Sequence, residues 1–439
     1  MAVSAALFAF GACTQPGPGD DDDMQQGSEL PDDEDSDNIG TPEQSGSEQV
    51  VDRIYYTTSD GQPLGLDFWD DKSLRLSADR YENGRGVLEF SGEGTLDNIP
   101  AQIFKGKGRL TSIELPENIS TIGEKAFAEC NSLERVTTGD RLVSIESEAF
   151  AYCLKLHDIV LPTGLTNIGE RAFACCYELI GLNIPASVTH IGQMAFVECE
   201  SLERVALPEG VTEVADNLFR ECRGLTEVTL GKAVKSIGEY AFYACYSLTS
   251  IALPDSVTTI GNCAFLDCGK MTTVTLGKGV KSIGELAFKQ CYRLRGIEIP
   301  EGVTRIEDDT FYQCSDMAKV TLPDGLLSIG RMAFYANNDL EEIVIPDSVT
   351  EIDAHAFSHC DHLSEITIGA GVQKIGKQAF GFSPYVGHAV YCRPIVPPVL
   401  EDDAFWYTST FYVPEASMEA YQTAEFWSQY AHNMKAYKF

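Results

Sequence analysis

The segment HAFSHCDH, residues 355–362, concentrates side chains that can bind a metal ion. Imidazole, thiolate and carboxylate groups at such close spacing could hold a zinc ion, and a bound zinc ion could activate water for hydrolysis. Whether these groups act together depends on the element that carries them, because an Ala-Phe pair followed by Cys recurs along the chain. The potential ligands are His355, His359, Cys360, Asp361 and His362.

A regular recurrence of phenylalanine explains this segment. Thirteen of the 22 phenylalanines follow one another at a spacing of 23 residues. A loop-rich globular domain does not keep such a register, whereas a solenoid, in which each repeat forms one coil, must keep it. These residues are Phe104, Phe127, Phe150, Phe173, Phe196, Phe219, Phe242, Phe265, Phe288, Phe311, Phe334, Phe357 and Phe380.

Other positions follow the same period. Cys stands three residues after most of these phenylalanines, Leu or Met six after, and Ile or Val nine after. The LxxIxL stretch predicts a short strand that Pro or Gly ends, and VxxIG predicts a second extended side with Gly at the corner. The xxAFxxC stretch predicts a tight or briefly helical turn. The cysteines in this slot are Cys130, Cys153, Cys176, Cys199, Cys222, Cys245, Cys268, Cys291, Cys314 and Cys360.

The consensus LxxIxLPxxVxxIGxxAFxxCxx resembles the 23-residue leucine-rich repeats of the BspA-like type, found in Treponema and Bacteroides surface proteins. The resemblance covers about residues 87–383. It implies an α/β horseshoe-type leucine-rich-repeat solenoid that is strand-rich with little helix and has parallel strands on its concave face. It also implies a binding role outside the cell.

The N-terminal residues differ in composition from the rest of the chain. The apolar run ending in FGAC resembles a bacterial lipoprotein signal, which implies that residues 1–13 are a signal peptide ending at a lipidated Cys13. Residues 14–49 hold 12 acidic and no basic residues, a composition that predicts a disordered acidic tether. The acids Asp20–Asp23 resemble the signal that sends lipoproteins of the Bacteroides group to the cell surface. We therefore expect a lipid-anchored, surface-exposed protein of the bacterial outer membrane.

The repeats divide the remainder of the chain. Terminal coils must cover an open apolar end, so we expect a cap on each side of the repeats. Residues 50–103 are predicted to form an N-terminal β cap with the first partial repeat, residues 104–383 the solenoid, and residues 384–439 a C-terminal cap with a strand and a helix.

The charge of the chain limits its partners. The formal net charge is −34, and outside the acidic tether 54 acidic residues still face 32 basic ones. Such a surface repels phosphate backbones, which argues against nucleic-acid binding. No segment after the N-terminal run is apolar enough to cross a bilayer, so we expect membrane contact only through the lipid anchor.

The repeat also reinterprets the groups that could do chemistry. Phe357 and Cys360 stand in core slots, so the cysteine is lost to any ligand set, and the neighbouring histidines are interpreted as polar turn residues rather than a metal site. The cysteine ladder is predicted to consist of buried free thiols. Acidic pairs such as 308–309 and 402–403 are interpreted as solvated. GxSxG, HExxH and phosphate-loop motifs are missing from the sequence, and we expect neither catalysis nor a cofactor.

Tyrosine is the most informative residue outside the core. Six tyrosines follow directly after a ladder Phe or Cys, where we expect them on the rim or convex side as candidate ligand-binding residues or as shields of neighbouring turns. Tyr312 and Tyr335 share one slot in consecutive coils and are expected about one strand spacing apart. The six are Tyr177, Tyr243, Tyr246, Tyr292, Tyr312 and Tyr335.

The strands are expected to present a small, smooth outward strip. One outward slot carries Thr229, Ala252, Thr275, Glu298, Thr321, Val344 and Thr367. These features indicate a non-enzymatic, cell-surface leucine-rich-repeat protein that binds a macromolecular ligand, with adhesion to host or bacterial surface proteins as the leading hypothesis. The alternative is a carbohydrate-capturing surface lipoprotein that uses exposed tyrosines. The expected partner is thus an extracellular protein or glycan.

Overall fold

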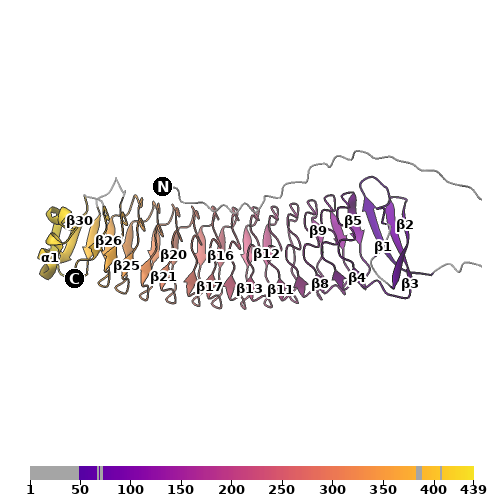
Figure 1. The fold of residues 1–439 in the computed structure, drawn as a ribbon, viewed down its shortest axis with the longest axis horizontal. Coiled ribbons are helices and arrows are strands. Elements are labelled where there is room, and N and C mark those ends of the chain that lie inside the picture. The colour runs from indigo at the N-terminus through magenta and orange to yellow at the C-terminus, as the bar shows by residue number, and fades with distance from the viewer. Residues whose placement is uncertain (1–48, 67–68, 70–72, 382–387, 406–407) are drawn as a thin grey trace, which may run out of the picture. The chain divides into compact units, whose positions relative to one another are not determined.

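The computed structural model of the protein describes residues 49–66, 69, 73–381, 388–405 and 408–439. Cys13 and all but the last residue of the expected tether lie outside these ranges. Residues 50–439 form one unit, in which coils stack along one axis from an N-terminal sheet to the C-terminal helix α1 (Met418–Thr423) (Figure 1). The expected strand-rich leucine-rich-repeat solenoid with little helix is confirmed.

One side of most coils is a short strand that pairs in parallel with the strand of the next coil. In Arg204–Ala206 the central Val205 is buried and both flanking side chains are exposed, as the apolar alternation predicts. We call the outward side chains of this ladder the strand face. Its strands are β5 (Leu110–Glu114), β7 (Arg135–Thr137), β9 (Asp158–Ile159), β12 (Arg204–Ala206), β14 (Glu227–Thr229), β16 (Ser250–Ala252), β18 (Thr273–Thr275), β20 (Gly296–Glu298), β22 (Lys319–Thr321), β24 (Glu342–Val344), β26 (Glu365–Ile368), β28 (Ala389–Cys392), β30 (Thr410–Pro414) and β31 (Met434–Tyr437).

The VxxIG stretch forms a second parallel ladder of two-residue strands. Glycine follows many of them because coils approach closely there: a Cβ on Gly123 would lie 2.6 Å from the carbonyl oxygen of Ile99 in the preceding coil. The strands are β4 (Asn98–Ile99), β6 (Thr121–Ile122), β8 (Ser144–Ile145), β10 (Asn167–Ile168), β11 (His190–Ile191), β13 (Glu213–Val214), β15 (Ser236–Ile237), β17 (Thr259–Ile260), β19 (Ser282–Ile283), β21 (Arg305–Ile306), β23 (Ser328–Ile329), β25 (Glu351–Ile352), β27 (Lys374–Ile375) and β29 (Val399–Leu400).

The xxAFxxC stretch forms the third side of the coil, as a chain of tight turns rather than a helix. Non-glycine residues two before and two after the phenylalanine have positive φ, as Lys125 (55°) and Glu129 (64°) do around Phe127. A left-handed L-residue costs roughly 1–2 kcal/mol. The cost is offset because this backbone also bonds to the next coil: the Lys125 N–H donates to the Ser147 carbonyl at 2.9 Å. We call the side chains of this side the turn face.

The phenylalanines form one continuous stack through the core. All thirteen are buried. Successive ring centroids lie between 4.9 and 5.7 Å apart, with ring planes within 17° of parallel. Loss of one such ring would open a cavity between its two neighbours, at a cost of roughly 3–5 kcal/mol.

The ladder cysteines are buried free thiols, which confirms the sequence prediction. Each thiol donates to a phenylalanine carbonyl of the preceding coil, as Cys199 Sγ does to Phe173 O at 3.2 Å. Burial raises the pKa of Cys199 to about 12, so this side chain is a thiol at neutral pH. Asn337 replaces the cysteine in one coil, and its side-chain oxygen accepts the Cys314 N–H at 2.9 Å.

Aromatic side chains cover both ends of the phenylalanine stack. At the N-terminal end, Trp69 meets Phe104 edge-on at 6.1 Å, beside the antiparallel strands β1 (Val50–Thr58), β2 (Leu74–Glu82) and β3 (Arg85–Gly92). At the C-terminal end, Phe405 adds a rung 5.1 Å from Phe380, and Trp427 packs against Phe405. This end consists of η1 (Glu415–Ser417), α1 and η2 (Ser428–Asn433) after β30.

His388 is a buried imidazole directly before β28. Its Nδ1 lies 3.4 Å from Ser409 Oγ, and its Nε2 has no hydrogen-bond partner among the described residues. Burial lowers the pKa of His388 from 6.5 to about 4. The folded protein therefore holds this ring neutral in a pH range where the unfolded chain protonates it.

Stability is expected to fall as the pH drops from about 6.5 to about 4, because only the unfolded state takes up the His388 proton there. The loss is about 3 kcal/mol at 1.36 kcal/mol per pKa unit and is complete below about pH 4. Urea unfolding of the wild type and a His388→Gln variant at pH 7 and pH 4.5 measures it. An equal pH dependence in both proteins would contradict the prediction.

Candidate functional site

The six candidate tyrosines fall into two columns along the turn face. Tyr243, Tyr312 and Tyr335 follow a ladder phenylalanine, and Tyr177, Tyr246 and Tyr292 follow a ladder cysteine. Tyr246 and Tyr292 are 39% and 38% exposed, whereas the other four are half-buried. The two columns thus offer different surfaces to a ligand.

Tyr312 and Tyr335 stack on each other as the repeat register predicts, with ring centroids 4.8 Å apart and planes within 4°. Lys289 of the preceding coil places Nζ 4.3 Å above the Tyr312 ring, and the His359 ring lies 5.1 Å from Tyr335. Lys289 and His359 therefore cover the outer faces of the pair, and mainly the ring edges and hydroxyls face solvent. A sugar that stacks on a tyrosine face has no open face at this pair.

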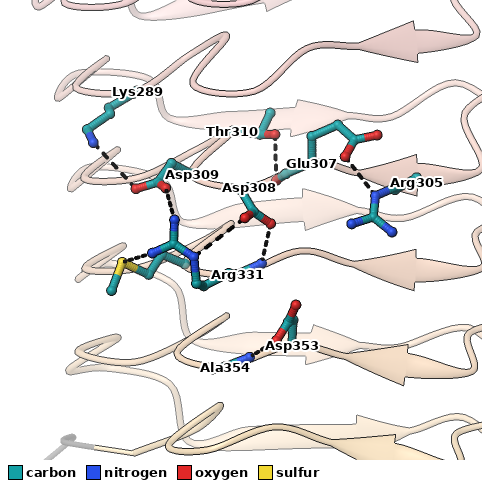
Figure 2. A network of polar contacts seen from close by, with 10 residues as sticks. Lys289, Arg305, Glu307, Asp308, Asp309, Thr310, Arg331, Asp353 and Ala354 are labelled. Atoms are coloured by element: carbon teal, nitrogen blue, oxygen red, sulfur yellow. Dashed lines mark hydrogen bonds and ion pairs between the residues drawn. The ribbon is translucent and has the colours of Figure 1, made fainter. Parts of the chain in front are cut away.

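Lys289, which lies over the Tyr312 ring, also belongs to a polar network, and Figure 2 shows this network. Lys289 and Arg331 approach the Asp309 carboxylate from the coils on either side, each at 3.4 Å and each on a different oxygen. Asp309 is 8% exposed, so its interpretation as a solvated acid is wrong. The acid occupies a left-handed turn position whose side chain points along the stack to its neighbours, and the two cations compensate its burial.

The neighbouring acids of this network bind locally. Asp308 lies 3.5 Å from Arg331 and also accepts the Arg331 backbone N–H at 2.8 Å. Glu307 stands where most other coils have the corner glycine, and pairs with Arg305 at 2.7 Å. The sequence IEDDTF, in place of IGxxAF, was a visible signal for this site, because three acids replace a glycine and two variable positions.

The remaining half-buried tyrosines have close polar neighbours. Arg220 lies over the Tyr243 ring at 5.4 Å, which repeats the cation–aromatic contact of Lys289. Burial is the main cause that raises the pKa of Tyr177, with Glu198 as the next contribution. Both tyrosines therefore interact with neighbouring side chains of the solenoid itself.

The HAFSHCDH segment is a turn of the solenoid. Phe357 and Cys360 point into the core as predicted, and Cys360 Sγ donates to the Phe334 carbonyl at 3.2 Å. His355 and His359 take left-handed conformations on either side of Phe357, so they do not form an i, i+4 pair on a helix. Within the part of the chain that the structure describes, no group of three His, Cys, Asp or Glu residues is placed to hold a metal ion.

The strand face is interrupted by a hollow of 520 Å³ between β22 and β24. Within the described ranges, no backbone hydrogen bond joins these two strands. Val344 at its rim is 56% exposed, and Arg393 from two coils further on lies 3.6 Å from Asp347. Its lining includes Lys319, Thr321, Glu342, Val344, Asp347 and Arg393.

Sequence reasoning missed an aromatic cluster at the C-terminal end of the strand face. Tyr391 and Tyr412 continue the outward slot of Thr367 and stack at 4.7 Å. Tyr437 on β31 meets both rings edge-on, at 5.3 and 5.8 Å. The alternation in AVYC and TFYVP was the available signal, but the 23-residue count ends before these segments.

Known proteins share this repeat. The family described as "BspA type Leucine rich repeat region (6 copies)" matches residues 97–226, 170–295, 212–339 and 281–410, which together make up more than half of the chain. The chain belongs to this family. Among proteins with curated descriptions, none matches the chain. No helix of the described residues is long and apolar enough to cross a membrane.

A solved structure supports the leucine-rich-repeat fold. A leucine-rich repeat protein from Bacteroides ovatus ATCC 8483 is 25% identical, with 82% of this chain and 90% of that chain covered and a TM-score of 0.59. A leucine rich repeat protein from T. pallidum is 37% identical over 34% of this chain and 71% of its own, with a TM-score of 0.33. A leucine rich cell surface protein from Faecalibacterium prausnitzii A2-165 is 27% identical over 74% and 94%, with a TM-score of 0.40.

The Asp309→Asn variant is expected to lose roughly 1.5–3 kcal/mol of unfolding free energy, because two partly buried cations lose their shared carboxylate. Asp308→Asn is the matched control, because it keeps the oxygen that accepts the Arg331 N–H and removes a more exposed charge. Its expected loss of unfolding free energy is about 0–1 kcal/mol. Urea unfolding of both variants at pH 7 makes the comparison. Equal losses would show that the burial of Asp309 adds nothing.

Proposed function

We propose that this BspA-type protein is a non-enzymatic adhesin, which binds host or bacterial surface proteins through its strand face. The side chains that could take part in catalysis or metal binding have structural roles instead. Cys360 fills the core, and Asp309 joins adjacent coils. A stack of coils that are hydrogen-bonded to one another is rigid, so a partner is bound by a surface formed in advance.

The hollow between β22 and β24 is the feature that best fits a protein contact. Protein interfaces concentrate binding energy in pockets that take an anchor side chain, with Tyr and Arg enriched around them. Here an exposed Val344 and the Arg393–Asp347 pair border the hollow, and Tyr391 and Tyr412 continue the same face two and three coils away. The rest of the strip carries mostly small side chains, which leaves room for a partner to lie flat.

Carbohydrate capture is the less favoured alternative. It depends on ring faces that a sugar can cover, and Lys289 and His359 occupy the outer faces of the Tyr312–Tyr335 pair. Tyr246 and Tyr292 are more exposed, but they are single rings in separate coils and do not form a continuous stacking surface. A protein partner that binds the strand face does not need an open aromatic ring face.

Replacing Val344 by Lys is expected to weaken binding of the full-length protein to its partner by about tenfold or more, since a charge then enters an apolar contact. Val160→Lys is the matched control, because Val160 is 71% exposed in the same outward slot eight coils away. Arrays of extracellular-matrix proteins, bacterial surface proteins and glycans provide the measurement. Hits on glycans alone, or equal effects of the two variants, would remove the strand-face adhesin proposal.

We also propose that a lipid on Cys13 holds the protein on the outside of the outer membrane. The resemblance of FGAC to a lipoprotein signal supports this, and Cys13 lies outside the described residues. A Cys13→Ser variant is expected to leave the membrane fraction and to lose incorporation of a labelled fatty acid. Retention of both properties by the variant would contradict the proposal.

A further inference from the structure

We propose that the turn face has a second contact site, in which Tyr246, Asp267 and Tyr292 receive an arginine or lysine side chain of a protein partner. This inference deepens the proposed function, because it names the chemistry of one contact with the partner. The site lies on a different side of the coils from the hollow at β22 and β24, so the two can be tested separately.

Glycine opens a gap between two tyrosines of one column. Tyr246, Gly269 and Tyr292 follow the ladder cysteines of three consecutive coils, so the tyrosines are two coils apart, or about 10 Å along the stack. Gly269 places no side chain between them. The two tyrosine rings make no contact with each other among the described ring contacts, in contrast to Tyr312 and Tyr335, which stack in adjacent coils.

Both tyrosines lie close to the middle coil. Burial is the main cause that raises the pKa of Tyr246, and the charge of the neighbouring Asp267 adds to this shift. Tyr292 lies against the glycine, since a Cβ built on Gly269 would be 3.5 Å from its Cδ2. Asp267 stands two residues before Gly269 in the middle coil, so its carboxylate lies beside the gap rather than at one end.

Asp267 is a half-buried acid, and no described cation forms an ion pair with it. Burial is the main cause that raises the pKa of Tyr243, of Tyr246 and of Tyr292, and the negative charge of Asp267 adds to each of these shifts. The nearest cation of the column, Arg223, pairs with Glu200 and Glu221, each at 3.0 Å. Lys270 is exposed next to the glycine, and no ion pair or cation–aromatic contact of its side chain occurs among the described residues.

The same protein contains the completed version of this arrangement. At the other column Lys289 lies 4.3 Å over the Tyr312 ring and 3.4 Å from the Asp309 carboxylate. Tyrosine rings and one carboxylate thus bind an ammonium group within the fold. At Tyr246, Asp267 and Tyr292 the rings and the carboxylate are present and solvent reaches them, but none of the described residues supplies the cation.

A cationic side chain suits this site better than an anion or a neutral group. Ring faces attract cations through their quadrupole, and a carboxylate adds a charge-assisted hydrogen bond. The formal charge of −34 favours the approach of basic partners over the whole surface, whereas the two rings and the gap add selectivity for a flat or compact cation.

The test uses the full-length protein and a fluorescein-labelled Gly-Ser peptide with three arginines, followed by anisotropy at about 150 mM salt. Its twin carries citrulline, which has nearly the same shape without the charge. We expect the arginine peptide to bind about tenfold more tightly than the citrulline peptide, and Tyr246→Ala, Tyr292→Ala and Asp267→Asn each to weaken it by about tenfold. Gly269→Lys is expected to abolish binding, because its own ammonium group fills the gap.

Matched variants separate this site from general attraction to an acidic protein. Gly269→Ala adds a Cβ at ordinary contact distance, Tyr152→Ala removes another 39% exposed tyrosine, and Glu298→Gln removes a strand-face charge. These three should bind the peptide within about twofold of wild type. Far-ultraviolet circular dichroism confirms that each variant is folded.

Equal binding of the arginine and citrulline peptides would overturn the proposal. Equal losses in the site variants and the matched variants would also overturn it, since binding would then be diffuse. Either result leaves the Val344 and Val160 comparison unaffected, so a failure here is distinguishable from a failure of the strand-face proposal.

Discussion

Register between neighbouring coils is the constraint on which the rest of the structure depends. Phenylalanine rings stack at 4.9–5.7 Å, and backbone hydrogen bonds join most neighbouring coils along each of the three sides. Each coil also accepts left-handed non-glycine residues on its turn side, because the turns then align with those of the next coil. No coil has a core of its own, so each is stable only between its neighbours.

The same register organises the surface into columns. A side chain has the equivalent side chain of the adjacent coil as its neighbour, so function depends on what each column places in succession. Where tyrosine follows tyrosine, as in Tyr312 and Tyr335, the rings satisfy one another. Where a glycine interrupts the column, as at Gly269, that slot holds no side chain and the Tyr292 ring lies against the glycine. The strand face has an interruption of its own, the hollow between β22 and β24.

The sequence was sufficient to predict what repeats. Counting from Phe104 predicted the core stack, the free thiols and the adjacency of Tyr312 and Tyr335, because each follows from slot and period alone. What departs from the period was not predicted. The burial of Asp309 depends on the positions that the Lys289 and Arg331 side chains reach. Phe380 and Phe405 are 25 rather than 23 residues apart, so counting in steps of 23 does not locate Tyr391 and Tyr412.

The fixed 23-residue period makes the length of the molecule adjustable by recombination. A genetic exchange that deletes or duplicates one whole coil joins equivalent slots, so the ring stack and the backbone ladders close again without a mismatch. An exchange that does not join equivalent slots places core and surface residues out of register. Descendants of this chain can therefore differ, in steps of about 5 Å, in the distance along the stack between the Tyr246–Tyr292 site and the hollow at β22 and β24. Each of these two surfaces is kept intact.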